Sequence, residues 1–266
     1  ASAGDTRGGR AAVHHRCAPG GAAVGLEAPP PGGDGCGGHC RLDTQPAGRA
    51  GSGAGSPITP ELLKRLYEAR LADPEGFRPA MWKVLCEDFF QADVPPDATV
   101  VEMAAGHCEF INAIRAGRKV AADINPAVAQ HAAPGVEVVV GNAAHLPLPP
   151  GSVDVVFMSN FLEHLDRTGI LDVLRECLRL LKPGGRLLIL QPNQRFVGRD
   201  YWMFFDHITP VDDRALCEVL GAVGFEVTRC IPRFLPFTTR SRIPKHTMLV
   251  RAYLRVPILW RAMGAQ

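Results

Sequence analysis

The stretch VVEMAAGHCEF, Val100 to Phe110, joins an apolar strand pattern to a helical pattern through a short loop that contains one glycine, Gly106. A strand, a glycine loop and a helix in this order are typical of the first unit of a nucleotide-binding α/β domain. Ala104 and Cys108 stand where such loops normally carry glycine. The stretch therefore raises two questions, whether the loop still holds a ligand and which ligand that is.

The pattern of the opening stretch repeats along the chain, because short apolar runs alternate with helical segments. Strands are predicted at 99–103, 119–124, 136–141, 153–159 and 186–191, with helical segments at 109–117, 126–132 and 169–182 and a further helix and strand within 213–231. Near-continuous apolar strands separated by helices predict a mostly parallel sheet that is covered on both faces. We therefore predict a doubly wound α/β domain, in which ligands bind outside the carboxyl ends of the strands.

The first 56 residues have a different composition from the rest of the 266-residue chain, since they hold 15 of its 28 glycines and show no periodic apolar pattern. Such a segment buries too little apolar surface to offset its ordering entropy, so 1–56 is predicted to be of low complexity and disordered. Its histidines and cysteines are too loosely spaced for a structural zinc site, and we predict no metal. They are His14, His15, Cys17, Cys36, His39 and Cys40.

The bulk properties set further limits. Hydrophobic residues make up 46% and charged residues 21% of the chain, and the net charge of +2 indicates no charged partner by itself. No apolar run approaches the about 20 residues that cross a bilayer, and no secretory signal opens the chain. The eight cysteines lack the spacing of a disulfide framework, so we expect reduced thiols and a cytoplasmic protein. The folded part is predicted to span 57–266, with N-terminal helices in 57–95.

Polar side chains follow the second and third predicted strands. Asp123 ends the second strand, 17 residues after Gly106, where a carboxylate can accept hydrogen bonds from a ribose diol. Asn142 ends the third, where its amide oxygen can accept from an adenine amino group while the Ala143 N–H donates to a ring nitrogen. The alternative is that Asp123 and Asn142 are turn or cap residues.

The loop after the fourth strand, SNFLEHL, carries Glu163 and His164 near the start of a helix. Glu163 could simply interact favourably with the helix dipole. Four polar loops at one end of one sheet, however, favour a binding site. A dinucleotide is the less favoured ligand, because Glu109 stands where the dinucleotide loop needs a glycine for close helix packing.

The run from about Val100 to Gln191 resembles the class I S-adenosylmethionine-dependent methyltransferases, which have a Rossmann-like fold. The resemblance rests on the acidic first strand with its glycine loop, the acidic end of the second strand, and the GNA, FLEHL and LKPGGRLLI segments. It extends from about residue 57 to the end of the chain, with a cofactor-binding core at 97–191. The segment YWMFFDHITP resembles a bacterial subgroup associated with glycan or small-molecule modification.

The resemblance implies S-adenosylmethionine as cofactor and assigns roles residue by residue. Glu102 would orient the loop and the methionine ammonium, Gly106 would allow close backbone approach, and Asp123 would contact the ribose. The implied cofactor-binding set is Glu102, Ala104, Gly106, Asp123, Ile124, Asn142, Ala143 and Asn160. Ala104 and Cys108 depart from the family pattern, and either costs about 1 kcal/mol or more if its φ is positive. The Cys108 side chain could also weaken or abolish cofactor binding.

The segment 192–266 is predicted to supply an acceptor lid and a basic C-terminal part. In the lid, Arg195, Tyr201, Trp202 and Phe205 are candidate substrate-binding residues. The candidate catalytic residues are His207, Asp206, Glu163 and His164, with His207 as general base if the acceptor is a hydroxyl. The alternative is that the aromatic residues pack in the core and that His207 caps the following helix.

The chain after Glu226 contains seven arginines and Lys245 but no acidic residue. A basic amphipathic segment of this kind can lie on an anionic membrane, and a solvated basic face is the alternative. No nucleic-acid-binding module is visible. The antiparallel strand that usually completes the sheet of this class is either supplied by TMLVRAYLRV, residues 247–256, or missing.

The resemblance and these observations predict methyl transfer from S-adenosylmethionine to an oxygen atom of a small-molecule or glycan acceptor, with lipid-linked acceptors included. The alternative is a catalytically silent binding protein that keeps the fold, and a nicotinamide oxidoreductase is the third hypothesis.

Overall fold

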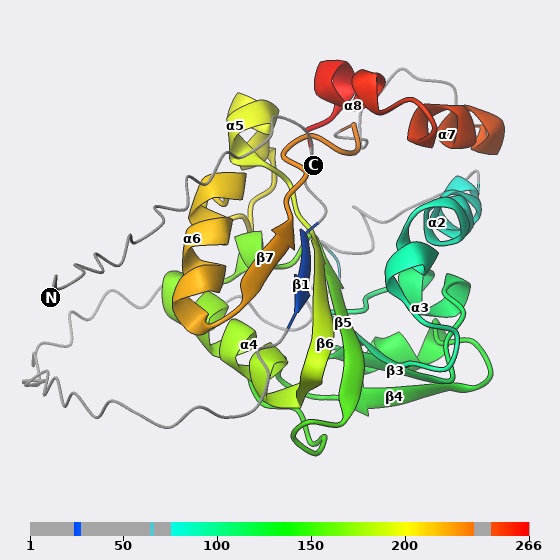
Figure 1. The fold of residues 1–266 in the computed structure, drawn as a ribbon, viewed down its shortest axis with the longest axis vertical. Helices are drawn as coiled ribbons and strands as arrows, with labels where there is room; N and C mark the ends of the chain where they lie inside the picture. Colours follow the sequence, from blue (N-terminus) through cyan, green and yellow to red (C-terminus); the bar gives the residue numbers. More distant parts are fainter. Residues whose placement is uncertain (1–23, 28–64, 66–75, 237–245, 266) are drawn as a thin grey trace, which may run out of the picture.

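A seven-stranded sheet forms the centre of the protein in the computed structural model, which describes residues 24–27, 65, 76–236 and 246–265 (Figure 1). The strand order is β4-β3-β2-β5-β6-β1-β7. The strands are β1 Val24–Glu27, β2 Thr99–Met103, β3 Arg118–Asp123, β4 Val136–Val140, β5 Val153–Ser159, β6 Leu181–Leu190 and β7 Glu226–Arg229. The five strands β2 to β6 pair in parallel, which confirms the predicted doubly wound fold.

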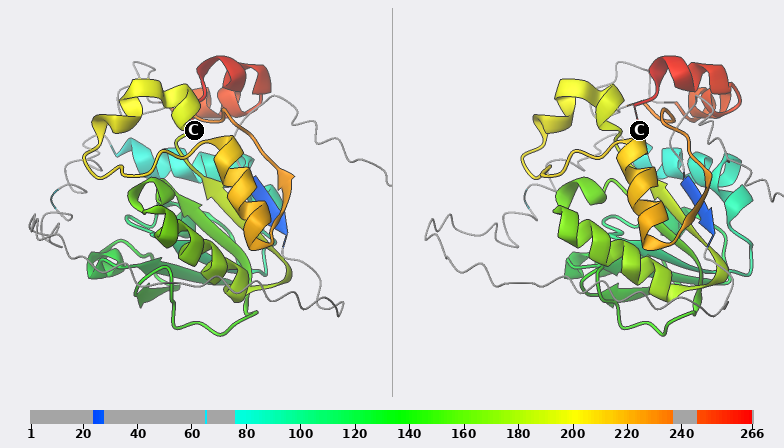
Figure 2. Two further views of the ribbon diagram at one scale, coloured as in Figure 1. Left: turned by 90° about the vertical axis from the view of Figure 1, so that its left-hand side faces the viewer. Right: turned by 60° about the vertical axis from the view of Figure 1, so that its left-hand side comes forward.

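Helices cover both faces of the sheet (Figures 1 and 2). The α-helices are α2 Phe77–Asp88, α3 Glu109–Ala113, α4 Arg167–Leu180, α5 Gln194–Val197, α6 Asp213–Val223, α7 Thr247–Leu254 and α8 Pro257–Met263. Short 3-10 helices are η1 Phe90–Asp93, η2 Pro126–Gln130, η3 Leu162–His164 and η4 Gly198–Met203. The helices at 109–117 and 126–132 are thus shorter than predicted. Of the N-terminal helices predicted in 57–95, the part before residue 76 lies outside the described residues except for Arg65.

Two apolar cores lie on the two faces of the sheet. Alternate residues of one strand face opposite sides, so Val101 joins the core under α4 and α6 while Val100 joins the core under α2 and α3. In the second core the ring of Phe110 stacks on that of Phe157, with centroids 3.6 Å apart. This contact holds α3, the helix that follows the glycine loop, directly against β5.

The strand β1 comes from the N-terminal segment and lies between β6 and β7, antiparallel to both. The prediction of disorder is therefore wrong for residues 24–27, while the rest of 1–56, with its histidines and cysteines, lies outside the described residues. The antiparallel strand of the sheet is not missing, because the N-terminal segment supplies it. TMLVRAYLRV does not supply it, because Thr247–Leu254 is the helix α7.

The segments α5, η4, α7 and α8 gather at the carboxyl ends of β5 and β6 (Figures 1 and 2). Asn193, just after β6, donates its backbone N–H to the carbonyl oxygen of Ala265 at 3.0 Å, which joins the two ends of this layer. Among the described residues, no helix is long and apolar enough to span a membrane.

Candidate cofactor and acceptor site

The loop after β2 adopts the backbone of a glycine loop despite its two substitutions. Ala104, Gly106 and Cys108 have φ angles of 53°, 51° and 58°, all in the left-handed region. A residue with a side chain pays about 1–2 kcal/mol in this region. The conformation that the glycines would favour is therefore kept at an energetic cost.

The side chain of Cys108 points into the protein core. It is fully buried, its Sγ lies 3.7 Å from the carbonyl oxygen of Val128, and burial raises the pKa of its thiol to about 12. A Cβ added to Gly106, in contrast, would meet no atom within 4 Å, so this glycine faces open space. The open side of the loop is consequently not filled by the cysteine.

Asp123 ties the glycine loop to the end of β3. Its Oδ2 accepts the backbone N–H of Gly106 at 2.9 Å, and its Oδ1 accepts that of Asn125 at 2.8 Å. A carboxylate oxygen has two lone pairs, so each oxygen can still accept from a ribose hydroxyl. The neighbouring Ile124 is 71% exposed and offers an apolar surface that an adenine ring could cover. This donor and acceptor set fits the predicted nucleoside half of the cofactor.

Glu102 lies almost fully buried on β2. Its Oε2 accepts the backbone N–H of Ile111 at 2.9 Å, which anchors the first turn of α3. Burial raises the pKa of this carboxyl well above its ordinary value. Glu102 thus positions the helix after the loop, and its contact with the methionine ammonium stays a prediction.

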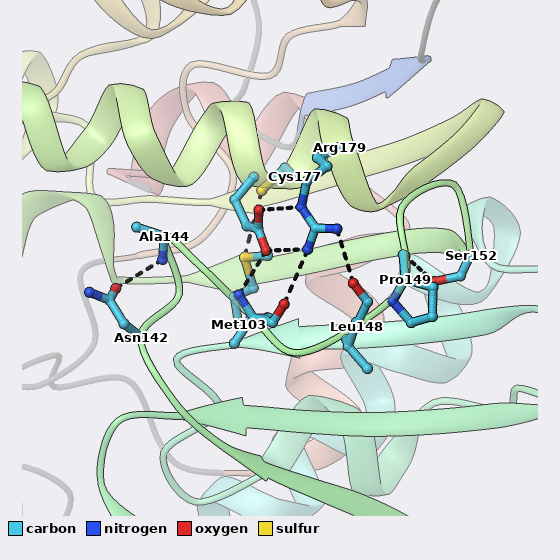
Figure 3. Close-up of polar contacts among 10 residues, drawn as sticks. Met103, Asn142, Ala144, Leu148, Pro149, Ser152, Cys177 and Arg179 are labelled. Carbon is cyan, nitrogen blue, oxygen red and sulfur yellow. Dashed lines mark hydrogen bonds and ion pairs between the residues drawn. The ribbon is translucent and has the colours of Figure 1, made fainter.

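Asn142 forms the local turn that the sequence offered as the alternative to an adenine contact. Its Oδ1 accepts the backbone N–H of Ala144 at 2.9 Å (Figure 3). The side chain is exposed, and the oxygen keeps a second lone pair. The contacts of Asn142 and Ala143 with adenine therefore stay predictions.

Two residues of α4 that the sequence analysis missed hold the loop after β4. Arg179 donates to the carbonyl oxygens of Leu146 and Leu148 at 3.1 and 3.0 Å, and it pairs with Glu176 at 2.7 Å (Figure 3). Glu176 also accepts the backbone N–H of Leu146 at 2.7 Å. Glu176 and Arg179 are three residues apart on one helix. This spacing predicts that the two side chains pair, but it does not indicate which loop they contact.

The four candidate catalytic residues come together beyond the ends of β5 and β6. Glu163 Oε1 lies 3.9 Å from His164 Nε2 and 3.8 Å from His207 Nε2. Asp206 Oδ2 lies 3.2 Å from His164 Nδ1. These four residues, called the Glu–His cluster below, are buried or nearly so.

Backbone and side-chain hydrogen bonds fix the Glu–His cluster. The carbonyl oxygen of Glu163 accepts the backbone N–H groups of Ile208 and Thr209 at 2.9 and 3.2 Å, which fastens the loop after η4 onto η3. Gln191 Nε2, at the end of β6, donates to Glu163 Oε2 at 2.6 Å. Gln191 was not among the predicted site residues. It lies at the end of β6 just as Asn160, which was predicted, lies at the end of β5. The alternative role of His207 as a helix cap is wrong, because Asp212 caps α6.

The aromatic residues of the lid do not form one wall. Tyr201 is fully buried, and its hydroxyl donates to the carbonyl oxygen of Thr209 at 2.6 Å and accepts the N–H of Val211 at 3.1 Å. We therefore correct its predicted role from substrate contact to a buried support of the loop. Trp202 and Phe205 are exposed, by 51% and 75%, so they face outward.

The other lid and cofactor candidates have structural partners. Arg195 pairs with Asp213 at 2.7 Å and so joins α5 to α6. Asn160, with a φ of 47°, donates its N–H to the carbonyl oxygen of Leu190 at 2.8 Å. Contacts of these residues with acceptor or cofactor stay predictions.

Comparisons with known proteins agree with this geometry. Residues 101–189 match the model of the methyltransferase domain family. The chain is 40% identical over 97 residues to a probable S-adenosylmethionine-dependent methyltransferase of Mycolicibacterium smegmatis, over 35% of this chain and 37% of the relative. It is 31% identical over 160 residues to a malonyl-[acyl-carrier protein] O-methyltransferase of Methylococcus capsulatus, over 53% of this chain and 56% of that protein.

Among solved structures, a SAM-dependent methyltransferase from Archaeoglobus fulgidus superposes with a TM-score of 0.52 at 19% identity, over 77% of this chain and 96% of that one, which shows the shared fold. The chain matches 37% of the length of the Mycolicibacterium relative. The sheet therefore has the Rossmann-like fold of the class I S-adenosylmethionine-dependent methyltransferases. Residues 101–189 thus carry the similarity to the methyltransferase domain family, and the similar proteins are S-adenosylmethionine-dependent methyltransferases.

Proposed function

We propose that the protein transfers a methyl group from S-adenosylmethionine to a hydroxyl oxygen of a small-molecule or glycan acceptor. The observation that carries this proposal is the position of the Glu–His cluster. β2 and β5 are adjacent parallel strands, so the glycine loop after β2 and the Glu163 segment after β5 leave the sheet at the same edge. The cluster thus lies beside the predicted cofactor site, where an acceptor must approach.

When bound, S-adenosylmethionine supplies a methyl group on a sulfonium, and the protein mainly has to align it with the acceptor. Gly106 and Asp123 are the residues that would hold the nucleoside half. The Glu–His cluster would promote loss of the acceptor hydroxyl's proton, because a carboxylate and two imidazoles offer acceptors for it. Burial strengthens the electrostatic interactions of these groups with the developing oxyanion.

We further propose that the acceptor is lipid-linked and that α7 and α8 lie on an anionic membrane surface. α7 packs on α2, where Arg251 pairs with Glu87 at 2.6 Å. Outward from this contact, apolar and basic side chains are exposed together on the two helices. They include Met248, Leu249, Ile258, Leu259, Arg261 and Met263 on the helices and Arg255 and Val256 between them. Such a mixture supports interfacial binding rather than a purely solvated basic face.

The first experiment is a calorimetric titration of the protein with S-adenosylmethionine and with S-adenosylhomocysteine. Asp123→Asn should weaken binding by about tenfold or more, because one hydrogen bond to a charged group contributes about 1.5–3 kcal/mol. Asp172→Asn, an exposed substitution of the same kind on α4, is the matched control and should bind like the unmodified protein. Thermal melting checks that each variant is folded.

Absence of binding to the folded protein would favour the catalytically silent alternative. If binding is found, release of S-adenosylhomocysteine is measured with free sugars and with polyisoprenyl-linked sugars as acceptors. Methylation of amine or carbon acceptors without any transfer to hydroxyls would contradict the assignment to oxygen.

A further inference from the structure

We propose that Glu163, His164 and His207 form a binding site for one divalent transition-metal cation. The potential ligand atoms of these three residues lie within 4.8 Å of one another, and they come from two segments that the fold brings together. Two imidazoles and one carboxylate are a common ligand set for such ions and leave coordination positions open.

The distances within the cluster suit an ion better than direct hydrogen bonds. Glu163 Oε1 lies 3.8 Å from His207 Nε2 and 3.9 Å from His164 Nε2. A direct N–H···O hydrogen bond is about 2.7–3.2 Å long, so these pairs are too far apart for one. Metal–ligand bonds of about 2.0–2.2 Å would fit between them after a small rotation of the side chains.

The groups behind the three ligands have the arrangement that supports metal-binding residues elsewhere. His164 Nδ1 lies 3.1 Å from the carbonyl oxygen of Asp206 and 3.2 Å from its Oδ2, so the imidazole presents Nε2 to Glu163. A backbone carbonyl or carboxylate behind a histidine in this way fixes the ring and makes the ligand nitrogen more basic. Gln191 Nε2 likewise donates to Glu163 Oε2 at 2.6 Å and leaves Oε1 facing the histidines.

Burial and charge favour a cation at the same point. Glu163 is 1% exposed, and His207 is buried as well. Burial of a carboxylate away from water is costly, and coordination of a cation by Glu163 would offset that cost. A divalent cation would supply the compensating charge.

The ligand set also indicates the class of ion. Two nitrogen ligands with one oxygen ligand favour ions such as Mn²⁺, Fe²⁺, Co²⁺ or Zn²⁺ over Ca²⁺ and Mg²⁺, which prefer all-oxygen sites. We choose Mn²⁺ as the probe, because soft ions such as Zn²⁺ could also bind cysteines of the N-terminal segment.

The role of the ion rests on the proposed function. An acceptor hydroxyl bound to the ion would have a lower pKa, as metal-bound water does, and would release its proton to solvent water. The oxygen's electron pair would then form the O–C bond while the carbon–sulfur bond breaks and its electron pair goes to sulfur. With the ion bound, the cluster would thus promote proton loss through the ion, and solvent water rather than a side chain of the cluster would take the proton.

The test is a titration of chelator-treated full chain with Mn²⁺, followed by electron paramagnetic resonance in the absence of cofactor. We expect one bound ion per chain. His164→Asn, His207→Asn and Glu163→Gln should each weaken binding at least tenfold. His145→Asn and Glu137→Gln replace exposed residues of the same types and should leave it unchanged.

Folded protein that binds no Mn²⁺, or binding that all three ligand variants leave unchanged, would overturn the proposal. Because a variant in a buried cluster can fail to fold, the thermal midpoint of the unmodified protein is measured as well and should rise with Mn²⁺ concentration. An unchanged midpoint at saturating Mn²⁺ counts against the site. Since cofactor binding is titrated separately, failure of the metal site and failure of the proposed function are distinguishable.

Discussion

Asp206 contacts His164, which is 42 residues away in the chain, through both its carboxylate and its backbone: His164 Nδ1 lies 3.2 Å from Oδ2 and 3.1 Å from the carbonyl oxygen. Asp206 thus positions His164 rather than its own neighbour in the sequence, His207. Adjacent side chains commonly diverge, and the fold uses this divergence to join two segments.

Asp206→Asn should therefore lower the affinity for Mn²⁺ by about 10- to 100-fold, the usual effect of removing a group that orients a metal-binding histidine. The affinity for S-adenosylmethionine should stay the same, because Asp206 is not among the proposed cofactor contacts. Paired titrations with Mn²⁺ and with the cofactor measure both. Equal Mn²⁺ affinity in the variant would mean that the Asp206 carboxylate does not orient the ligand.

Ala104→Gly should stabilise the protein by about 0.5–1 kcal/mol. Glycine removes the strain of the positive φ angle, of about 1–2 kcal/mol, but increases the entropy of the unfolded chain by part of that amount. Denaturant unfolding measures the difference. Ala113→Gly, in the helix α3, is the control and should destabilise instead. Destabilisation by both variants to the same extent would contradict the left-handed backbone of Ala104.

The Glu176–Arg179 pair should make stability depend on pH. Burial would raise the pKa of Glu176, but hydrogen bonds from Arg179 and the Leu146 amide outweigh this and hold the pKa below its ordinary value of 4.5. A lowered pKa in the folded state means that the carboxylate stabilises the protein above pH 4.5 and that this contribution is lost as the pH falls through the folded-state pKa.

Glu176→Gln should accordingly lower the stability by about 1–3 kcal/mol at neutral pH, and the difference from the unmodified protein should shrink in acid. Thermal melts over a pH series measure it. Glu137→Gln, which removes an exposed pair with Arg118, should cost at most about 1 kcal/mol. A difference that does not change with pH would argue against an ionised Glu176 as the cause.

The parallel sheet was predictable from the sequence because its strands read as apolar runs, and the central ones, such as VDVVFMS, are buried on both faces. The acidic and amide residues at the strand ends were predictable for a related reason, since parallel strands bring their carboxyl ends to one edge. β1 was not predictable, because VGLE is a four-residue strand whose place depends on the open position between β6 and β7 rather than on its own pattern.

Side-chain direction explains the errors in the lid. Composition identified an aromatic segment, but it could not indicate that Tyr201 turns inward to support Thr209 while Phe205 turns outward. Each residue of the Glu–His cluster was predicted as a candidate from the sequence. Their arrangement was not predictable, because it depends on the folding of the loop after η4 onto η3. Gln191 and Arg179 carry no motif, and only the tertiary structure shows their targets.

Membrane contact predicts a distinct pattern of variants on α8. Ile258→Ser should reduce sedimentation of the protein with vesicles that contain anionic phospholipid, because Ile258 is exposed and would insert its side chain. Arg261→Gln should reduce binding to anionic vesicles. The binding that remains should rest more on the exposed apolar side chains. Ile124→Ser, an equally exposed apolar position at the end of β3, is the control. Equal binding to neutral and anionic vesicles would contradict an electrostatic contribution.

The last prediction concerns the contribution of the N-terminal strand β1 to stability. β1 is hydrogen-bonded on both sides, so its removal leaves the facing edges of β6 and β7 without a partner strand. A chain that begins at Ala23 keeps the strand, and one that begins at Ala28 lacks it. Only the second truncation should destabilise the protein, since each buried backbone group left without a hydrogen bond costs about 1–3 kcal/mol.

Thermal melting and amide hydrogen exchange of the two truncated chains provide the measurement. In the shorter chain, protection should be lost first in β7, whose only strand partner among the described residues is β1, while β2 to β5 keep theirs. If both truncations melt together with the full chain, the sheet does not depend on β1. If both are destabilised equally, residues before Ala23 contribute as well, and the effect does not belong to the strand alone.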